Sequence, residues 1–212
     1  MHPLIARVTS TQWIDGNRRA DFSLDVDSAI TQITQAAPAL TFITTPNNPT
    51  GEAISISEIE KIAQSVPGLL VVDEAYAEFS DEVSAVTLIA KYPQIVVIRT
   101  MSKAFSFAGA RVGYLLAHPT VVEAMLLVRL PYHLSTLTQG AALVALDFKT
   151  ELLSGVAQLR AERNRVADSL REMGLTVLPS QANFLLFSGF QVTSAQLWQE
   201  MLDRGILIRD VG

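Results

Sequence analysis

Short apolar runs of strand length recur along the first part of the chain, separated by segments with a helical spacing of apolar residues. Consecutive apolar and β-branched residues are typical of parallel strands that are buried on both faces of a sheet. Residues 55–66 combine a serine cap and early glutamates with apolar residues at i, i+3 and i+4, which predicts a helix. The alternation predicts an α/β domain with a mostly parallel sheet sandwiched by helices. The expected strands are 40–44, 69–73, 95–100 and 111–117.

The pattern changes after residues 129–136, where longer helical segments begin. The remaining chain predicts a smaller α+β unit, with helices at 138–148, 151–174 and 194–205 and short strands at 176–179, 183–187 and 206–210. We therefore expect residues 1–140 to form part of a large α/β domain and residues 141–212 part of a small C-terminal α+β domain. The chain starts without an evident opening strand and stops directly after an apparent one, so we expect it to be a piece of a longer protein that lacks both termini.

Composition narrows the function classes. The 212 residues are 49% hydrophobic, enough for a sizeable core. The net charge is -5, and no basic cluster exceeds residues 17–19, which argues against a nucleic-acid partner. Cysteine is absent and the three histidines are scattered, so we expect neither thiol chemistry nor a metal site. With no signal peptide and no apolar run of about 18 residues, we expect a soluble cytoplasmic protein without a membrane partner.

Polar residues follow each predicted strand of the large domain. In open α/β sheets ligands bind at the carboxyl ends of the strands, so these residues should converge on one crevice. Taken singly, each has an ordinary structural interpretation: a turn, a helix cap, a core aromatic, a solvated lysine or a surface arginine. A site would be absent only if all of these ordinary interpretations held at once, and the order of the residues at successive strand ends argues against that. The candidates are Asn48, Asp73, Tyr76, Thr100, Ser102, Lys103 and Arg111.

The chemistry of this set points to one cofactor. A lysine with a lowered pKa forms Schiff bases, and an arginine with adjacent hydroxyls suits a phosphate monoester. A buried carboxylate suits a protonated ring nitrogen, while asparagine and tyrosine together suit a phenolate-like oxygen. Pyridoxal 5'-phosphate carries an aldehyde, a phosphate, a pyridine nitrogen and a ring oxygen. The sequence therefore predicts a pyridoxal phosphate site.

Four motifs carry a family resemblance: “NNPTG”, “DEAYAEF”, “SKAFSFAGARVGY” and “ANFLLF”. In this order they resemble the class I/II aminotransferases, pyridoxal-phosphate enzymes of the aspartate-aminotransferase fold (fold type I), over nearly the whole chain. Through “DEAYAEF”, “LPYHLS” and “GILIRD” the chain is most similar to the branch of that family that acts on histidinol phosphate. The resemblance implies the conversion of L-histidinol phosphate and 2-oxoglutarate to imidazole acetol phosphate and L-glutamate in histidine biosynthesis. It also implies a homodimer in the full-length form.

The resemblance implies a role for each candidate residue. Lys103 would be the catalytic lysine that bonds to the cofactor aldehyde and moves a proton between the substrate carbon and the cofactor. Asp73 would pair with the ring nitrogen, and Asn48 and Tyr76 would contact the ring oxygen. The phosphate would be held by Arg111 with Ser102 and Thr100. Two further positions, Tyr132 in “LPYHLS” and Arg209 in “LIRD”, would bind substrate.

Other interpretations stay open. The chain could come from an aromatic or broad-range aminotransferase, or from a phosphate-ester decarboxylase of the same fold. It could also be a non-catalytic aminotransferase-like domain that serves as a sensor or interaction module. By the resemblance, the phosphate loop, the aromatic that stacks on the cofactor ring and the arginine for the donor carboxylate lie outside these 212 residues. We therefore expect this piece alone to be far less active than a longer form.

Overall fold

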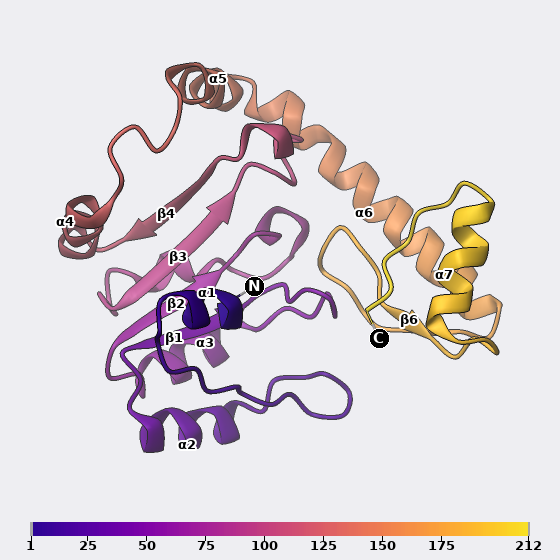
Figure 1. Cartoon of the computed structure of the whole chain (residues 1–212), viewed down its shortest axis with the longest axis horizontal. Helices are drawn as coiled ribbons and strands as arrows, with labels where there is room; N and C mark the ends of the chain where they lie inside the picture. Colours follow the sequence, from indigo (N-terminus) through magenta and orange to yellow (C-terminus); the bar gives the residue numbers. More distant parts are fainter. Residues whose placement is uncertain (1, 212) are drawn as a thin grey trace.

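The computed structural model describes residues 2–211 and shows an α/β sheet followed by a helical segment and a small C-terminal unit (Figure 1). The four-stranded sheet has the order β1-β2-β3-β4. Its parallel strands are β1 (Leu40–Thr44), β2 (Leu69–Asp73) and β3 (Ile95–Thr100), and β4 (Gly113–Ala117) closes one side. The mostly parallel α/β fold predicted from the sequence is confirmed.

The direction of β4 corrects the prediction of a buried parallel strand at 111–117. β4 pairs antiparallel with β3, with Thr100 opposite Gly113, and the two arrows point in opposite directions in Figure 1. The link between the two strands holds only the short 3₁₀ turn η3 (Ala108–Ala110). Parallel strands are usually joined by a crossover that contains an α-helix, and a link without one favours an antiparallel return of the chain. The first three residues of β4 are exposed rather than buried.

Helices cover one face of the sheet through alternating strand residues. Leu70 and Val72 of β2 lie in register with Ile95 and Val97 of β3, and all four side chains are fully buried. They pack against α3 (Ile56–Ala63) and α2 (Val26–Ala36) in one apolar cluster. The predicted serine cap of α3 is present as half of a capping box: the Ser55 side chain accepts from the Glu58 amide, and the Glu58 carboxylate accepts from the Ser55 amide. A short helix, α1 (His2–Val8), precedes these elements.

A second apolar cluster forms on the chain that follows β2 and β3. Its buried members are Phe79 of η1 (Ala77–Phe79) and four residues of the link between β3 and β4: Met101, Ala104, Phe105 and Val112. Side chains of α5 (Thr136–Asp147) and α6 (Lys149–Glu172) pack against this cluster. The turn η2 (Ala85–Leu88) instead belongs to the cluster under α3.

The C-terminal unit follows the long helix α6, which runs from α5 to this unit (Figure 1). Gly174, with φ of +84°, ends α6 as predicted, and the helix predicted at 194–205 is present as α7 (Ser194–Asp203). The two short strands are β5 (Thr176–Val177) and β6 (Phe187–Ser188), paired antiparallel. α4 (Pro119–Val128) lies between β4 and α5.

The strand predicted at residues 206–210 is wrong, because within the described chain none of these residues belongs to a strand or to either of its two sheets. A strand needs a neighbour for its backbone groups, and apolar composition alone does not supply one. The division into domains at about residue 140 stays a prediction.

Candidate active site

The turn after β1 is held by hydrogen bonds of Asn47. The Asn47 side chain accepts from Thr44 Oγ1 at 2.5 Å and donates to Thr50 Oγ1 at 2.9 Å. The backbone carbonyl of Asn47 accepts from the Gly51 amide at 2.7 Å. Asn48 then reaches across to the chain after β2, where its Nδ2 donates to the Tyr76 hydroxyl at 2.9 Å. Asn48 was predicted from the sequence, whereas the role of Asn47 in shaping the turn was not.

Asp73 and Tyr76 lie at the carboxyl end of β2. Asp73 is the last residue of that strand, and its Oδ1 accepts from the Ala75 amide at 3.0 Å, which turns the chain sharply at the strand end. Tyr76 follows at the start of η1. Tyr76 and Phe184 make an edge-to-face aromatic contact, with ring centroids 5.1 Å apart and ring planes at 85°. Phe184 belongs to the “ANFLLF” motif, so the C-terminal unit forms part of the site wall.

Lys103 lies three residues beyond β3, in a turn that places its ammonium over the Tyr76 ring at 5.7 Å from the centroid. The contact brings together three of the predicted residues, Asn48, Tyr76 and Lys103, from the ends of three different strands. The side chain of Lys103 is exposed, so its amine remains in contact with water.

The predicted phosphate-binding residues form a second group. Thr100 Oγ1 accepts from the Ser102 amide at 3.1 Å and lies 2.9 Å from Ser102 Oγ, which places two hydroxyls side by side at the end of β3. Arg111 has a left-handed backbone with φ of +55° and ends η3, two residues before the position of β4 that pairs with Thr100. Its guanidinium donates to the Ala108 carbonyl at 3.2 Å and is otherwise exposed.

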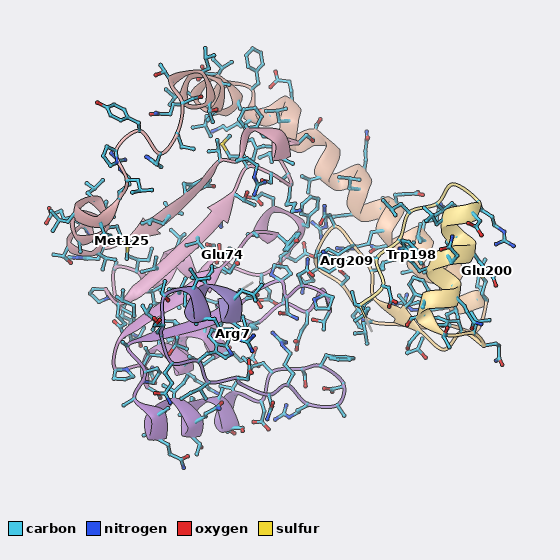
Figure 2. All side chains as sticks on the ribbon, in the orientation of Figure 1. Arg7, Glu74, Met125, Trp198, Glu200 and Arg209 are labelled. Atoms are coloured by element: carbon cyan, nitrogen blue, oxygen red, sulfur yellow. The ribbon has the colours of Figure 1, made fainter. Side chains whose placement is uncertain are left out.

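The two predicted substrate residues are not brought into these groups. Tyr132 lies in the segment between α4 and α5 and is 99% exposed. Arg209 is exposed on the C-terminal segment, where Figure 2 shows it on the side of α7 that is turned toward the sheet. Their roles stay predictions.

A buried ion pair beside the site was missed by the sequence argument. Glu74, labelled in Figure 2, directly follows Asp73 and is only 3% exposed. Its carboxylate accepts from Arg99 Nη2 at 2.7 Å, and Glu78 lies 3.5 Å from the same guanidinium. Burial raises the pKa of the Glu78 carboxyl above its ordinary value of 4.5, and the nearby Arg99 opposes that shift. The signal was available: residues 73 and 74 point to opposite faces of a strand, so two adjacent carboxylates cannot share one site.

A sizeable cavity beside the sheet lies away from these residues. A cavity of about 620 Å³ lies along the outer edge of β1, between α2 and the segment that precedes it. None of the predicted site residues lines this cavity. The site is therefore identified by its converging polar side chains rather than by an enclosed volume.

None of the helices between residues 2 and 211 combines the length with the apolar character of a membrane span. Nor does that part of the chain hold a cluster of three or more histidine or carboxylate side chains that could bind a metal ion.

Comparison with known proteins gives a consistent picture. Residues 1–212 match the family described as aminotransferase class I and II. The chain is 56% identical to a histidinol-phosphate aminotransferase of Rhodococcus opacus (strain B4) and 54% identical to one of Thermobifida fusca (strain YX). All of this chain is covered in both comparisons, but only 56% and 58% of the relatives, so it spans little more than half their length.

Solved structures agree. The histidinol-phosphate aminotransferase from Sinorhizobium meliloti, determined in complex with pyridoxal-5'-phosphate, superposes with a TM-score of 0.90 at 27% identity. The match covers 99% of this chain and 59% of that one. A Thermus thermophilus aspartate aminotransferase variant, at 20% identity and a TM-score of 0.79, shares the fold. The family resemblance predicted from the motifs is thus confirmed, and the chain belongs to the class I and II aminotransferases.

Proposed function

We propose that this chain carries the cofactor-binding part of a pyridoxal-phosphate-dependent aminotransferase that converts L-histidinol phosphate and 2-oxoglutarate to imidazole acetol phosphate and L-glutamate. The observation that carries the proposal is the grouping of Asn48, Tyr76 and Lys103 at three strand ends of a class I and II aminotransferase chain. The substrate follows the relatives that are 53% to 56% identical, which are named histidinol-phosphate aminotransferases.

The donors and acceptors at the strand ends fit pyridoxal phosphate. Asp73, a carboxylate at the end of β2, suits the protonated ring nitrogen, and the hydrogen-bonded pair of Asn48 and Tyr76 suits the ring oxygen. The adjacent hydroxyls of Thr100 and Ser102 suit phosphate oxygens. The guanidinium of Arg111 and the amine of Lys103 complete the set, for the phosphate and the aldehyde respectively.

The cofactor, when bound, supplies an electron sink for negative charge at the substrate carbon. The protein supplies the rest of the chemistry. Asp73 keeps the ring nitrogen protonated by placing a negative charge beside it. Lys103 Nζ takes and returns the proton at the substrate carbon, within reach of the Tyr76 ring that it now faces. Tyr132 and Arg209 are proposed to contact the substrate.

We further propose a homodimer in the full-length form, small-molecule substrates only, and a cytoplasmic location. The small-molecule substrates are supported by the name of the relatives, histidinol-phosphate aminotransferase, and the lack of a nucleic-acid partner by the net charge of -5. The division into a large domain at 1–140 and a small domain at 141–212 is proposed in the same way. It is supported by β5 and β6, which pair with each other and not with the larger sheet.

Chemical labelling tests the cofactor lysine. Borohydride reduction of the chain incubated with pyridoxal phosphate makes a lysine–cofactor bond permanent, and peptide mapping then locates it. We expect the label on Lys103, and Lys103→Ala should lose it while retaining weaker, non-covalent cofactor binding. A label on Lys61, Lys91 or Lys149 would overturn the assignment. A coupled assay with histidinol phosphate, run on a form extended to the length of the relatives, tests the reaction itself.

A further inference from the structure

A network of hydrogen bonds joins β2 and β3 directly behind the candidate site, and the proposed reaction gives it no role. Arg99 of β3 donates from Nη2 and Nε to the same Glu74 oxygen, at 2.7 and 3.1 Å. Ser84 Oγ donates to that oxygen at 2.7 Å and accepts from Arg99 Nη2 at 2.9 Å. The other Glu74 oxygen accepts from the Ala85 amide at 2.7 Å. A buried carboxylate with this many partners holds its position tightly.

The network lies where the pairing of the two strands stops. The register of β2 and β3 ends with Asp73 opposite Ile98, and the Glu74 amide donates to the Ile98 carbonyl at 2.9 Å. One residue further along each strand, Glu74 and Arg99 point to the opposite face, because side chains alternate across a strand. The ion pair therefore holds the two strand ends together on one face, while Asp73 and Thr100 point to the other.

We propose that Glu74 and Arg99 are positioning residues that fix the distance between Asp73 and the hydroxyls of Thr100 and Ser102. The inference rests on the proposed function, since it takes as ligand a molecule held at both ends, by its ring nitrogen and its phosphate. Such a ligand gains affinity from two groups only when the protein presents their partners at a fixed separation. The rigid plane of the guanidinium resists sliding of one strand past the other, which a flexible lysine would permit.

The proposal separates ligands that use both strand ends from ligands that use one. Pyridoxal phosphate spans both ends, pyridoxal lacks the phosphate, and inorganic phosphate lacks the ring. Loosening the strand ends should weaken the binding of pyridoxal phosphate and leave the binding of pyridoxal and of inorganic phosphate nearly unchanged. A residue that served only to stabilise the fold would affect all three ligands alike.

The experiment measures the dissociation constants of these three ligands by titration, in the 212-residue chain and in a form extended to the length of its relatives. The variants are Glu74→Gln, Arg99→Lys and the milder Ser84→Ala, which removes one hydroxyl and leaves the ion pair. The matched control is Lys91→Gln, which breaks the ion pair, 2.7 Å long, between the exposed Lys91 and Glu60 of α3. Thermal unfolding without ligand shows which variants are folded.

We expect Glu74→Gln and Arg99→Lys to lower the affinity for pyridoxal phosphate about tenfold, or about 1.4 kcal/mol. The affinity for pyridoxal or for phosphate should fall less than about twofold. Ser84→Ala should give a smaller loss with the same selectivity, and Lys91→Gln none. Equal losses for pyridoxal phosphate and pyridoxal, or no loss in the folded variants, would overturn the positioning role. Unmodified protein that binds pyridoxal phosphate no better than pyridoxal would instead refute the proposed function, and the positioning role with it.

Discussion

Gly51 offers a direct test of how the C-terminal unit is held against the site. It ends the turn that carries Asn48 and has φ of +78°. A Cβ at this position would overlap Ser180 Oγ and would lie 2.6 Å from Ser180 Cβ and 2.9 Å from Ser180 Cα. The Gly51 carbonyl also accepts from the Gln181 amide at 2.8 Å. Gly51→Ala should therefore push the segment at residues 180–184, including Phe184, away from Tyr76.

The chain contains a matched control. Gly205 has the same φ of +78°, but a Cβ there would meet no atom within 4 Å. The left-handed backbone costs alanine roughly 1–2 kcal/mol at either position, partly offset by about 0.4–1 kcal/mol from the stiffer unfolded chain. At Gly51 alone, the clash with Ser180 adds about 1–3 kcal/mol and the lost hydrogen bond about 1 kcal/mol. We expect the free energy of unfolding to fall by about 1 kcal/mol for Gly205→Ala and about 3–5 kcal/mol for Gly51→Ala.

Urea unfolding of both variants measures these losses, and limited proteolysis reports whether residues 180–184 become accessible. Gly51→Ala should be cleaved in that segment faster than Gly205→Ala under native conditions. Equal losses of stability, with equal cleavage, would show that the close approach of Ser180 to Gly51 does not hold the two parts together.

Further expectations concern catalysis, pH and association. Asp73→Asn, in a form extended to the length of the relatives, should lower kcat by roughly 10²–10³, about 3–4 kcal/mol of barrier, while urea unfolding changes little; unchanged turnover would rule out its role. The raised pKa of Glu78 means that the folded state binds the proton of this carboxyl more tightly than the unfolded state does. The stability that protonated Glu78 contributes is therefore fully present below pH 4.5 and is lost as the pH rises through the raised pKa. Unfolding curves at several pH values should show a smaller loss over this window for Glu78→Gln, and an unaltered profile would contradict the assignment. Leu127 and Leu130, 87% and 73% exposed, should drive self-association of the chain, which Leu127→Lys with Leu130→Lys should reduce in sedimentation velocity; identical behaviour would exclude this surface.

Much of the fold was predictable because the apolar pattern reflects burial on each strand. The three strands of consecutive apolar residues lie where the pattern placed them, and the helix at 56–63 begins at the predicted serine cap. Strand direction is a different property, set by the connection. The link of residues 101–112 has no helix to cross over the sheet, and this absence was the available signal for an antiparallel β4.

Elements with a weaker pattern escaped prediction. α4 has apolar residues on nearly all sides and leaves Leu126, Leu127 and Val128 exposed, so no periodicity marks it as a surface helix. α2 does carry a usable signal, because Asp25 caps it by accepting from the Ser28 amide. That cap was overlooked beside the stronger strand pattern that follows it.

The candidate site shows what strand-end reasoning can and cannot give. It brought Asn48, Tyr76 and Lys103 together, because the carboxyl ends of parallel strands meet at one edge of a sheet. It could not place Tyr132, which lies on a segment between two helices, where no sheet edge dictates its direction.

The alternation of side chains along β2 and β3 places a second pair of residues on the other face of the sheet. A strand that presents Asp73 to a ligand must present Glu74 to the protein interior, and a carboxylate buried there needs a cation. Arg99 meets that need from the corresponding position of β3, one residue before Thr100. Two polar residues in succession at a strand end therefore predict two groups rather than one: a pair for the ligand, and behind it an ion pair that holds the strands. Where a sheet binds a charged ligand at its edge, the residues that contact the ligand are half of the arrangement, and their immediate neighbours in sequence are the place to look for the other half.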